Sequence, residues 1–133
     1  MNKKLVYLSV DQIIEYNILA INLIQVKKGD KAEVLSKSKI NDIVEFCKEV
    51  KGDVYDKAVF LLKGLIQKHP FASGNRRTAF IVVKAFLLIN NQVLGVNDDP
   101  EQARIMIGIR ENFYKDEELK EWLKHGKIRK FER

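Results

Sequence analysis

The chain of 133 residues carries a formal net charge of +6, and 46% of its residues are hydrophobic while 32% are charged. This length fits one domain, residues 1–133, and the apolar content excludes a disordered chain, since enough surface can be buried to offset the conformational entropy lost on folding. The sequence has no run of about 20 apolar residues and only one cysteine, Cys47, so we expect neither a membrane span nor an intrachain disulfide.

The N-terminal residues do not have the apolar run of a signal peptide, and the single cysteine suits a reducing compartment, so we expect a cytoplasmic protein. The positive charge is compatible with an anionic partner, such as a nucleotide, a nucleic acid or an acidic protein. Lysines on a solvated surface give the same net charge. Charge alone therefore does not identify the partner.

Apolar residues recur at helical spacing along nearly the whole chain. We expect six helices, over about residues 9–26, 39–51, 54–68, 76–89, 100–110 and 116–125. Ser9 and Gln12 have capping-box spacing before the first helix, and Asp53 precedes the third. Asp99 and Pro100 place an N-cap and a first-turn proline at the start of the fifth. These starts support the assignment, and little strand is expected.

The fourth expected helix, residues 76–89, is apolar on nearly every side. A helix without a polar face is normally buried inside its domain. The sequence therefore predicts an all-α fold, a compact bundle of six helices around a buried central helix, with a core from about residue 8 to residue 126. The basic tail, residues 127–133, is expected to fray.

The irregular run between the third and fourth helices combines features that suit a phosphate site. Gly74 and Asn75 tolerate the positive φ angles that turn backbone N–H groups inward as an anion nest. The start of the next helix adds unpaired N–H groups and the positive end of a helix dipole. Arg76 and Arg77 add donors that match phosphate oxygens, and His69 can exchange a proton near neutral pH. A base beside a phosphate cradle is the layout of a phosphoryl- or nucleotidyl-transfer site.

Each of these features has a simpler explanation when it stands alone. A histidine at a helix end is often a cap, a Gly-Asn pair is often a turn, and paired arginines are often solvated. Their order within nine residues, next to a helix that must be buried, favours the site. A basic helical protein that binds nucleic acid is a third interpretation, but most aromatic residues fall at core spacings and no recognition-helix motif is evident.

The run HPFASGNRRTA, residues 69–79, resembles the motif of the Fic/Doc family, which is commonly written HPFx(D/E)GNGRxxR in Fic proteins and H-x-F-x-D-A-N-K-R-T-A in Doc toxins. The matching residues are His69, Pro70, Phe71, Gly74, Asn75 and Arg77. The Arg-Thr-Ala ending, and Phe80 where Fic proteins place a second arginine, are closer to Doc, the death-on-curing type. The six-helix plan is also similar to Doc over roughly residues 8–126.

The resemblance implies a transferase that moves a phosphate or AMP from ATP, or a related nucleotide, to a protein hydroxyl, as a toxin of a toxin–antitoxin pair does. It implies that His69 is the general base, that Gly74 and Asn75 bind phosphate, and that Arg77 is the phosphate-binding arginine of the family. Arg76 then stands where Doc has a lysine. The implied partners are a target protein, such as a translation factor, and a separate antitoxin, because the sequence contains no clear inhibitory segment of its own.

The chain departs from the motif at Ser73, where the family has an acidic residue that helps to hold Mg²⁺. A neutral hydroxyl is a poorer ligand than a carboxylate for a hard dication. We therefore expect a weakened Mg²⁺ site and assign no metal ligand. A nucleotide-binding pseudoenzyme of the same fold is the alternative to an active transferase.

Overall fold

The computed structural model describes residues 4–23 and 29–132. Its six α-helices are α1 (Val10–Leu23), α2 (Lys37–Glu49), α3 (Val54–Gln67), α4 (Asn75–Ile89), α5 (Pro100–Arg110) and α6 (Asp116–His125). The described residues contain no β-strand, and an isolated antiparallel bridge joins Val34 to Phe71. None of the described helices has both the length and the apolar composition that crossing a bilayer requires. The predicted all-α fold is confirmed.

Local capping explains where most helices begin. At α1, the Ser9 N–H donates to Gln12 Oε1 and the Gln12 N–H donates to Ser9 Oγ, which is the predicted capping box. Asp53 caps α3 by accepting from the N–H groups of Tyr55 and Asp56. Asp99 caps α5 in the same way. These three starts follow the sequence prediction because each depends only on neighbouring residues.

Two helix ends differ from the prediction. The N-cap of α2 is Ser36, whose hydroxyl accepts from the Lys39 N–H, so α2 begins two residues before the expected position. It also ends two residues earlier than expected, at Glu49. The predicted last turn of the first helix, residues 24–26, lies outside the described residues.

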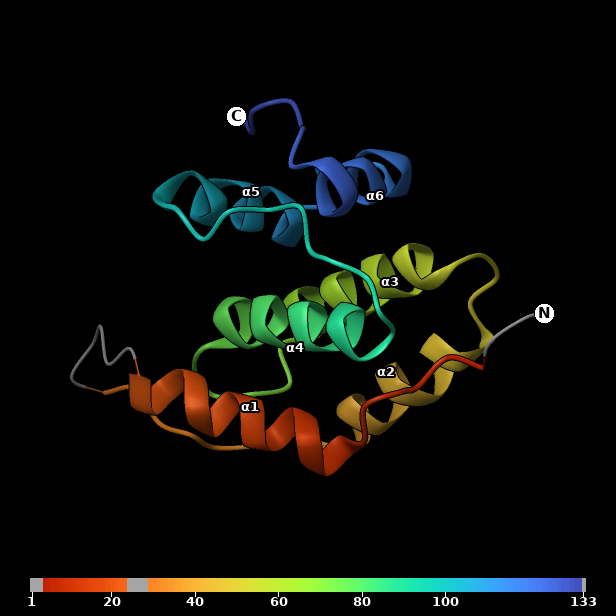
Figure 1. Ribbon diagram of the computed structural model, residues 1–133. Coiled ribbons are helices and arrows are strands. Elements are labelled where there is room, and N and C mark those ends of the chain that lie inside the picture. Colours follow the sequence, from red (N-terminus) through yellow and green to blue (C-terminus); the bar gives the residue numbers. More distant parts are fainter. Residues whose placement is uncertain (1–3, 24–28, 133) are drawn as a thin grey trace.

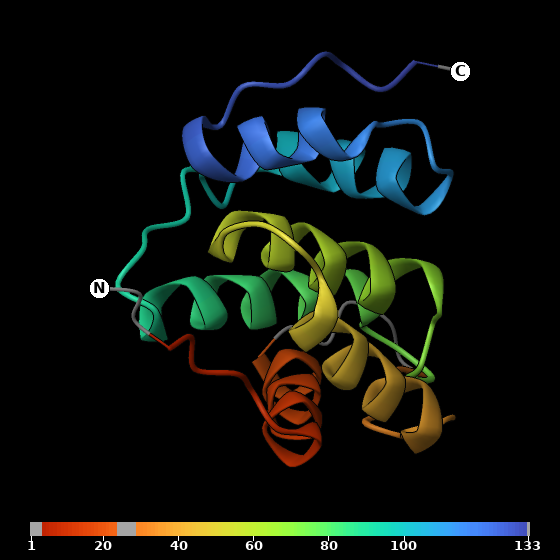
Figure 2. The ribbon, with the colours of Figure 1, turned by 90° about the vertical axis from the view of Figure 1, so that its right-hand side faces the viewer.

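The helices form three layers, with α5 and α6 on one side, α3 and α4 in the middle, and α1 and α2 on the other side (Figures 1 and 2). α3 packs against α2, α4, α5 and α6, whereas α4 packs against α1 and α3. The end of α4 reaches the surface, where Leu88 and Ile89 are 53% and 41% exposed. The buried centre is therefore shared by α3 and α4, since α4 has buried residues from its first residue to Leu87 and is exposed only at Arg76 near its start, at Lys84 and at its last two residues.

The C-terminal segment packs against the bundle as far as residue 132, so the expected fraying is wrong for the described residues 127–132. Phe131 is buried and its ring lies edge-on to Phe113. Arg104 Nε donates to the Phe131 carbonyl at 3.1 Å, and Tyr114 Oη donates to the Arg129 carbonyl at 2.9 Å. The basic composition of the tail predicted that it would be solvated. The burial of one aromatic side chain, Phe131, is enough to keep the segment packed against the bundle.

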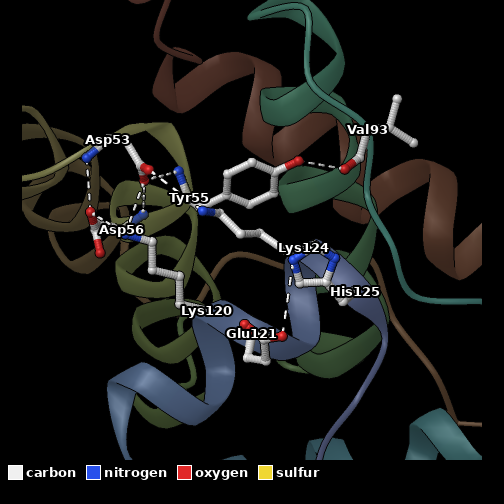
Figure 3. Close-up of polar contacts among 8 residues, drawn as sticks. All are labelled: Asp53, Tyr55, Asp56, Val93, Lys120, Glu121, Lys124 and His125. Carbon is white, nitrogen blue, oxygen red and sulfur yellow. Dashed lines mark hydrogen bonds and ion pairs between the residues drawn. The ribbon is translucent and has the colours of Figure 1, made fainter.

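Figure 3 shows how α6 is fastened to the first turn of α3. Lys120 Nζ lies 3.0 Å from Asp56 Oδ2, and Lys124 Nζ lies over the Tyr55 ring. Tyr55 Oη donates to the Val93 carbonyl, which brings in the segment between α4 and α5. Burial raises the pKa of Asp56, but hydrogen bonds from Lys120 and the backbone outweigh it, so the pKa lies below its ordinary value. Such partly exposed pairs stabilise a fold little and mainly set helix orientation.

A buried lysine donates hydrogen bonds to the backbone at the C-terminal end of α2. Lys57 on α3 is 7% exposed, and its Nζ donates to the carbonyls of Cys47, Lys48 and Val50 at 3.2, 3.1 and 2.6 Å. The Cys47 carbonyl also accepts from the Val50 N–H at the C-cap of α2, and the ammonium group adds a donor to all three carbonyls and complements the helix dipole. Cys47 is in the core, and burial raises the pKa of its thiol to about 11.

Candidate functional site

The loop between α3 and α4 has a left-handed backbone at both ends. His69 has a φ of 52°, and Gly74, the N-cap of α4, has a φ of 75°. The positive φ at Gly74 favours glycine, and a Cβ there would lie 2.9 Å from Ile21 Cδ1, so the end of the Ile21 side chain would also have to move. No side chain among the described residues caps this terminus, which leaves the first N–H groups of α4 available to an anion.

The side chain of Asn75 holds the loop in this shape. The Phe71 N–H donates to Asn75 Oδ1 at 3.0 Å, and Asn75 Nδ2 donates to the Phe71 carbonyl at 2.9 Å. Asn75 Nδ2 also lies 3.1 Å from His69 Nδ1, and Asn75 is 6% exposed. Because the amide is used within the loop, a contact of Asn75 with phosphate would have to come from its backbone N–H.

The contacts of Asn75 also determine the protonation of the His69 ring. The two bonds to Phe71 fix which end of the amide is nitrogen, so Nδ2 faces His69 as a donor. His69 Nδ1 must then accept, and the proton of the neutral ring lies on Nε2. A base needs an unoccupied lone pair, and in this arrangement the only lone pair of the ring is already bonded to Asn75.

Two further elements brace the loop from outside. Asn17 of α1 is 1% exposed, and its Nδ2 donates to the Ser73 carbonyl and to Thr78 Oγ1, both at 3.0 Å. The sequence analysis missed Asn17, although an asparagine on the apolar stripe of a helix is a signal for such a contact. On the other side, the N–H groups of Leu35 and Ser36 donate to the Pro70 carbonyl at 2.8 and 3.1 Å. The loop therefore has its shape without a ligand.

The five residues predicted to form the site line one pocket of about 600 Å³. They are His69, Gly74, Asn75, Arg76 and Arg77. α1 contributes Ile21 to the walls, and α5 contributes Gln102, Met106 and Arg110, none of which the sequence analysis singled out. The start of α4 and its two arginines thus face a space large enough for a nucleotide.

The two arginines differ in their contacts. Arg76 is exposed, whereas Arg77 binds the Asp98 carboxylate through Nη1 at 3.1 Å and Nη2 at 3.3 Å. The two side chains of this pair are 36% and 52% exposed. A pair this exposed contributes at most about 1 kcal/mol, so a more highly charged phosphate group can replace the carboxylate. Binding of phosphate by Arg77 therefore competes with Asp98.

Oxygen ligands for a metal are sparse in the pocket. Asp30 is the only acidic residue that lines it, and the neighbouring Lys31 N–H donates to Ser73 Oγ at 3.4 Å. The part of the chain that is described has no group of three or more His, Cys, Asp and Glu side chains able to hold an ion. These residues fit only a Mg²⁺ ion that is held mainly by the phosphates of a nucleotide.

The contact with Asn75 predicts a single tautomer for His69. At a pH where the ring is neutral, ¹⁵N–¹H correlation spectra should show Nδ1 unprotonated and the proton on Nε2. His125 is exposed on α6 and serves as the control, because it should exchange between both tautomers. Asn75→Ala should give His69 the mixed pattern of His125, and a His69 ring protonated on Nδ1 in the unaltered chain would contradict the assignment.

The Arg77–Asp98 pair predicts that Asp98→Asn strengthens triphosphate binding. The loss of the competing carboxylate should raise affinity for ATP by up to about five-fold at low salt, and less at high salt. Calorimetry measures this directly. Glu49→Gln, which removes one exposed negative charge at the end of α2, should leave the affinity unchanged; equal effects of the two substitutions would show that only net charge matters.

The chain matches the model of a known protein family. Residues 7–87 match the Fic/DOC family, a region that runs from just before α1 through most of α4 and includes the pocket loop. No curated protein matches the chain. Members of this family typically transfer nucleotidyl groups to proteins. Since the match covers more than half of the chain, the protein belongs to the Fic/DOC family.

Proposed function

We propose that this protein transfers a phosphate or AMP from ATP, or a related nucleotide, to a hydroxyl group of another protein. The observation that carries the proposal is the pocket in which His69, the start of α4, Arg76 and Arg77 meet. The dipole and free N–H groups of α4 would hold the phosphates, and the arginines would add charge-assisted hydrogen bonds. Arg77 would exchange Asp98 for a phosphate oxygen.

The reaction forms one P–O bond and breaks another. The target hydroxyl oxygen attacks the α-phosphorus with departure of pyrophosphate, or the γ-phosphorus with departure of ADP, and its proton passes to His69. The lone pair of Nδ1 is bonded to Asn75 in the resting state, so His69 must leave that contact, or exchange tautomer, before it accepts the proton. This step is where Asn75 would control the reaction.

A Mg²⁺ ion bound with the nucleotide would neutralise charge on the phosphates. Asp30, which lines the pocket, would contact it through its carboxylate; Ser73 stands at the position of the acidic motif residue but does not line the pocket, and its hydroxyl accepts from the Lys31 N–H. With Ser73 in place of the acidic motif residue, most of the side-chain charge would come from Asp30. The metal site is thus weak rather than lost on this proposal.

The partners follow from the closeness to Doc toxins. A target protein that offers a hydroxyl, such as a translation factor, and a separate antitoxin are the proposed partners. The pocket does not support the third interpretation, a nucleic-acid-binding protein, because the walls of the pocket include the apolar side chains of Ile66, Phe80 and Met106.

A nucleotide-binding pseudoenzyme is the second candidate. Two observations favour it: the hydroxyl of Ser73 replaces a metal-binding carboxylate, and the lone pair of His69 is occupied by Asn75. Both impair transfer and leave the phosphate cradle complete. The two candidates therefore share nucleotide binding and differ in catalysis.

Transfer is tested with ATP labelled separately at the α- and γ-phosphates and incubated with a cell lysate. Protein labelled by the α-phosphate alone indicates transfer of AMP, and protein labelled by the γ-phosphate alone indicates transfer of phosphate. His69→Ala should lower transfer by about 10²–10⁴-fold, because a general base is lost, with ATP affinity nearly unchanged. His125→Ala, the matched control on α6, should keep full activity. Binding without transfer would favour the pseudoenzyme, and absence of ATP binding would refute both candidates.

The proposed metal contact predicts that Asp30→Asn reduces the gain in ATP affinity that Mg²⁺ brings, by about five-fold or more, since one nearby charge is removed. Ser73→Asp should increase this gain by restoring a carboxylate beside the phosphates. ATP titrations with and without Mg²⁺ measure both effects, with Asp42→Asn on α2 as the charge control. If Ser73→Asp weakens binding in Mg²⁺, the pocket does not use the metal of its family.

A further inference from the structure

A buried side chain of α1 holds the peptide group between Ser73 and Gly74 in one orientation. Asn17 Nδ2 donates to the Ser73 carbonyl and to Thr78 Oγ1, both at 3.0 Å, and Asn17 is 1% exposed. A carbonyl oxygen can only accept, so the contact identifies Nδ2 as the nitrogen of the amide, and both of its hydrogens are used. The Ser73 carbonyl is therefore fixed on the side of the loop that faces α1.

The position of this carbonyl determines the direction of the next backbone donor. The described residues contain no cis peptide bond, and in a trans peptide the N–H points opposite to the C=O. The Gly74 N–H is therefore directed away from Asn17. It has no acceptor within residues 4–23 and 29–132, and Gly74 lines the candidate pocket. The Gly74 N–H is thus a donor that the described part of the protein does not use.

The backbone at Gly74 would not keep this peptide in place by itself. Gly74 has a φ of 75°, and glycine adopts positive and negative φ about equally well, so the peptide could turn over at little steric cost. A turned peptide would present the Ser73 carbonyl oxygen where the N–H had been. Inward-facing N–H groups attract an anion, whereas an oxygen with a partial negative charge repels it. The direction of one peptide therefore decides whether this position favours phosphate.

We infer that Asn17 is a positioning residue for the phosphate site. By holding the Ser73 carbonyl, it keeps the Gly74 N–H directed at a phosphate oxygen of the bound nucleotide. Asn17 does not line the pocket, so it acts through the peptide and not by contact with the ligand. The inference rests on the proposed function, because the anion is the phosphate chain of that nucleotide.

The test compares two substitutions that break different contacts of the Asn17 amide. Asn17→Leu has nearly the same shape and no hydrogen-bonding group, whereas Thr78→Val removes only the second acceptor. Calorimetry of the full chain with inorganic triphosphate and with ATP should show that Asn17→Leu weakens both by about ten-fold or more, the loss expected for one hydrogen bond to a charged group. Thr78→Val should change both affinities by less than about two-fold, because the bond to the Ser73 carbonyl remains.

Amide spectra separate positioning from a structural role. When inorganic triphosphate is added to the unaltered chain, the Gly74 amide proton should move downfield, as expected for a new hydrogen bond to an anion. This shift should be lost in Asn17→Leu. The His69 ring should keep its proton on Nε2 in that variant, because the contacts of Asn75 do not involve Asn17. Both substitutions remove a buried hydrogen bond and should lower the melting temperature, so stability alone does not distinguish them.

Asn22→Leu is the matched control on the same helix. Asn22 is exposed and lies outside the pocket, so its substitution should change neither the two affinities nor the shift of the Gly74 proton. If Asn17→Leu does not fold, Asn17→Ala replaces it, because alanine also lacks the amide and is readily accommodated in a helix. Asn17→Ala should show the same losses of affinity and of the Gly74 shift.

The remaining outcomes overturn the inference in distinguishable ways. An unchanged triphosphate affinity in Asn17→Leu refutes it, as does a Gly74 proton that does not move when the unaltered chain binds triphosphate. Equal losses in Asn17→Leu and Thr78→Val show that Asn17 only holds α1 against α4. A changed His69 tautomer in Asn17→Leu shows that the whole loop has altered its shape. Absence of triphosphate and ATP binding by the unaltered chain refutes the proposed function itself.

Discussion

The Asn75 amide is the interaction on which the candidate site depends. Its oxygen and nitrogen bind the two backbone groups of Phe71, and the same nitrogen meets Nδ1 of His69. Phe71 is fully buried, so these bonds attach the loop to a fixed point in the core. Asn75 is also the first residue of α4, and one side chain therefore couples the anchor of the loop, the orientation of the histidine and the start of the helix that is proposed to bind phosphate.

The backbone N–H groups of the site already have positions that suit an anion, whereas the charged side chain of Arg77 is paired with a carboxylate. Asn17 and the segment before α2 hold the loop from two sides, and Gly74 has the left-handed conformation that opens the start of α4. Preorganised donors need no rearrangement when charge arrives. Arg77 instead has a carboxylate partner, Asp98, that must be displaced. On the proposed function, affinity for phosphate would be set by a fixed backbone and adjusted by an exchangeable ion pair.

Features that depend on neighbouring residues could be read from the sequence. The capping residues Ser9, Asp53 and Asp99 predicted three helix starts. Residues 69–77 are consecutive in the sequence, so they are close together in any fold. Contacts between different helices or segments could not be predicted, even where these are close in the sequence. Lys57 closes α2 from another helix, and Phe131 holds a segment whose charge suggested fraying. Helical periodicity reports which face is apolar and not which helix covers it.

Two residues that line the pocket carry an unfavourable feature. His69 has a positive φ that a residue with a Cβ rarely adopts, and the side-chain nitrogen of Gln102 is buried without a partner among the described residues. Such features persist where the surrounding structure imposes them, and they concentrate at sites where a ligand supplies the missing interaction. Ser73 removes an unfavourable group instead of adding one. It is neutral where the family has a carboxylate that helps to hold Mg²⁺, and its hydroxyl accepts from the Lys31 N–H. On the proposed function, the pocket thus keeps the features that would serve nucleotide binding and has lost one that would serve catalysis, so binding and transfer have to be measured separately in this protein.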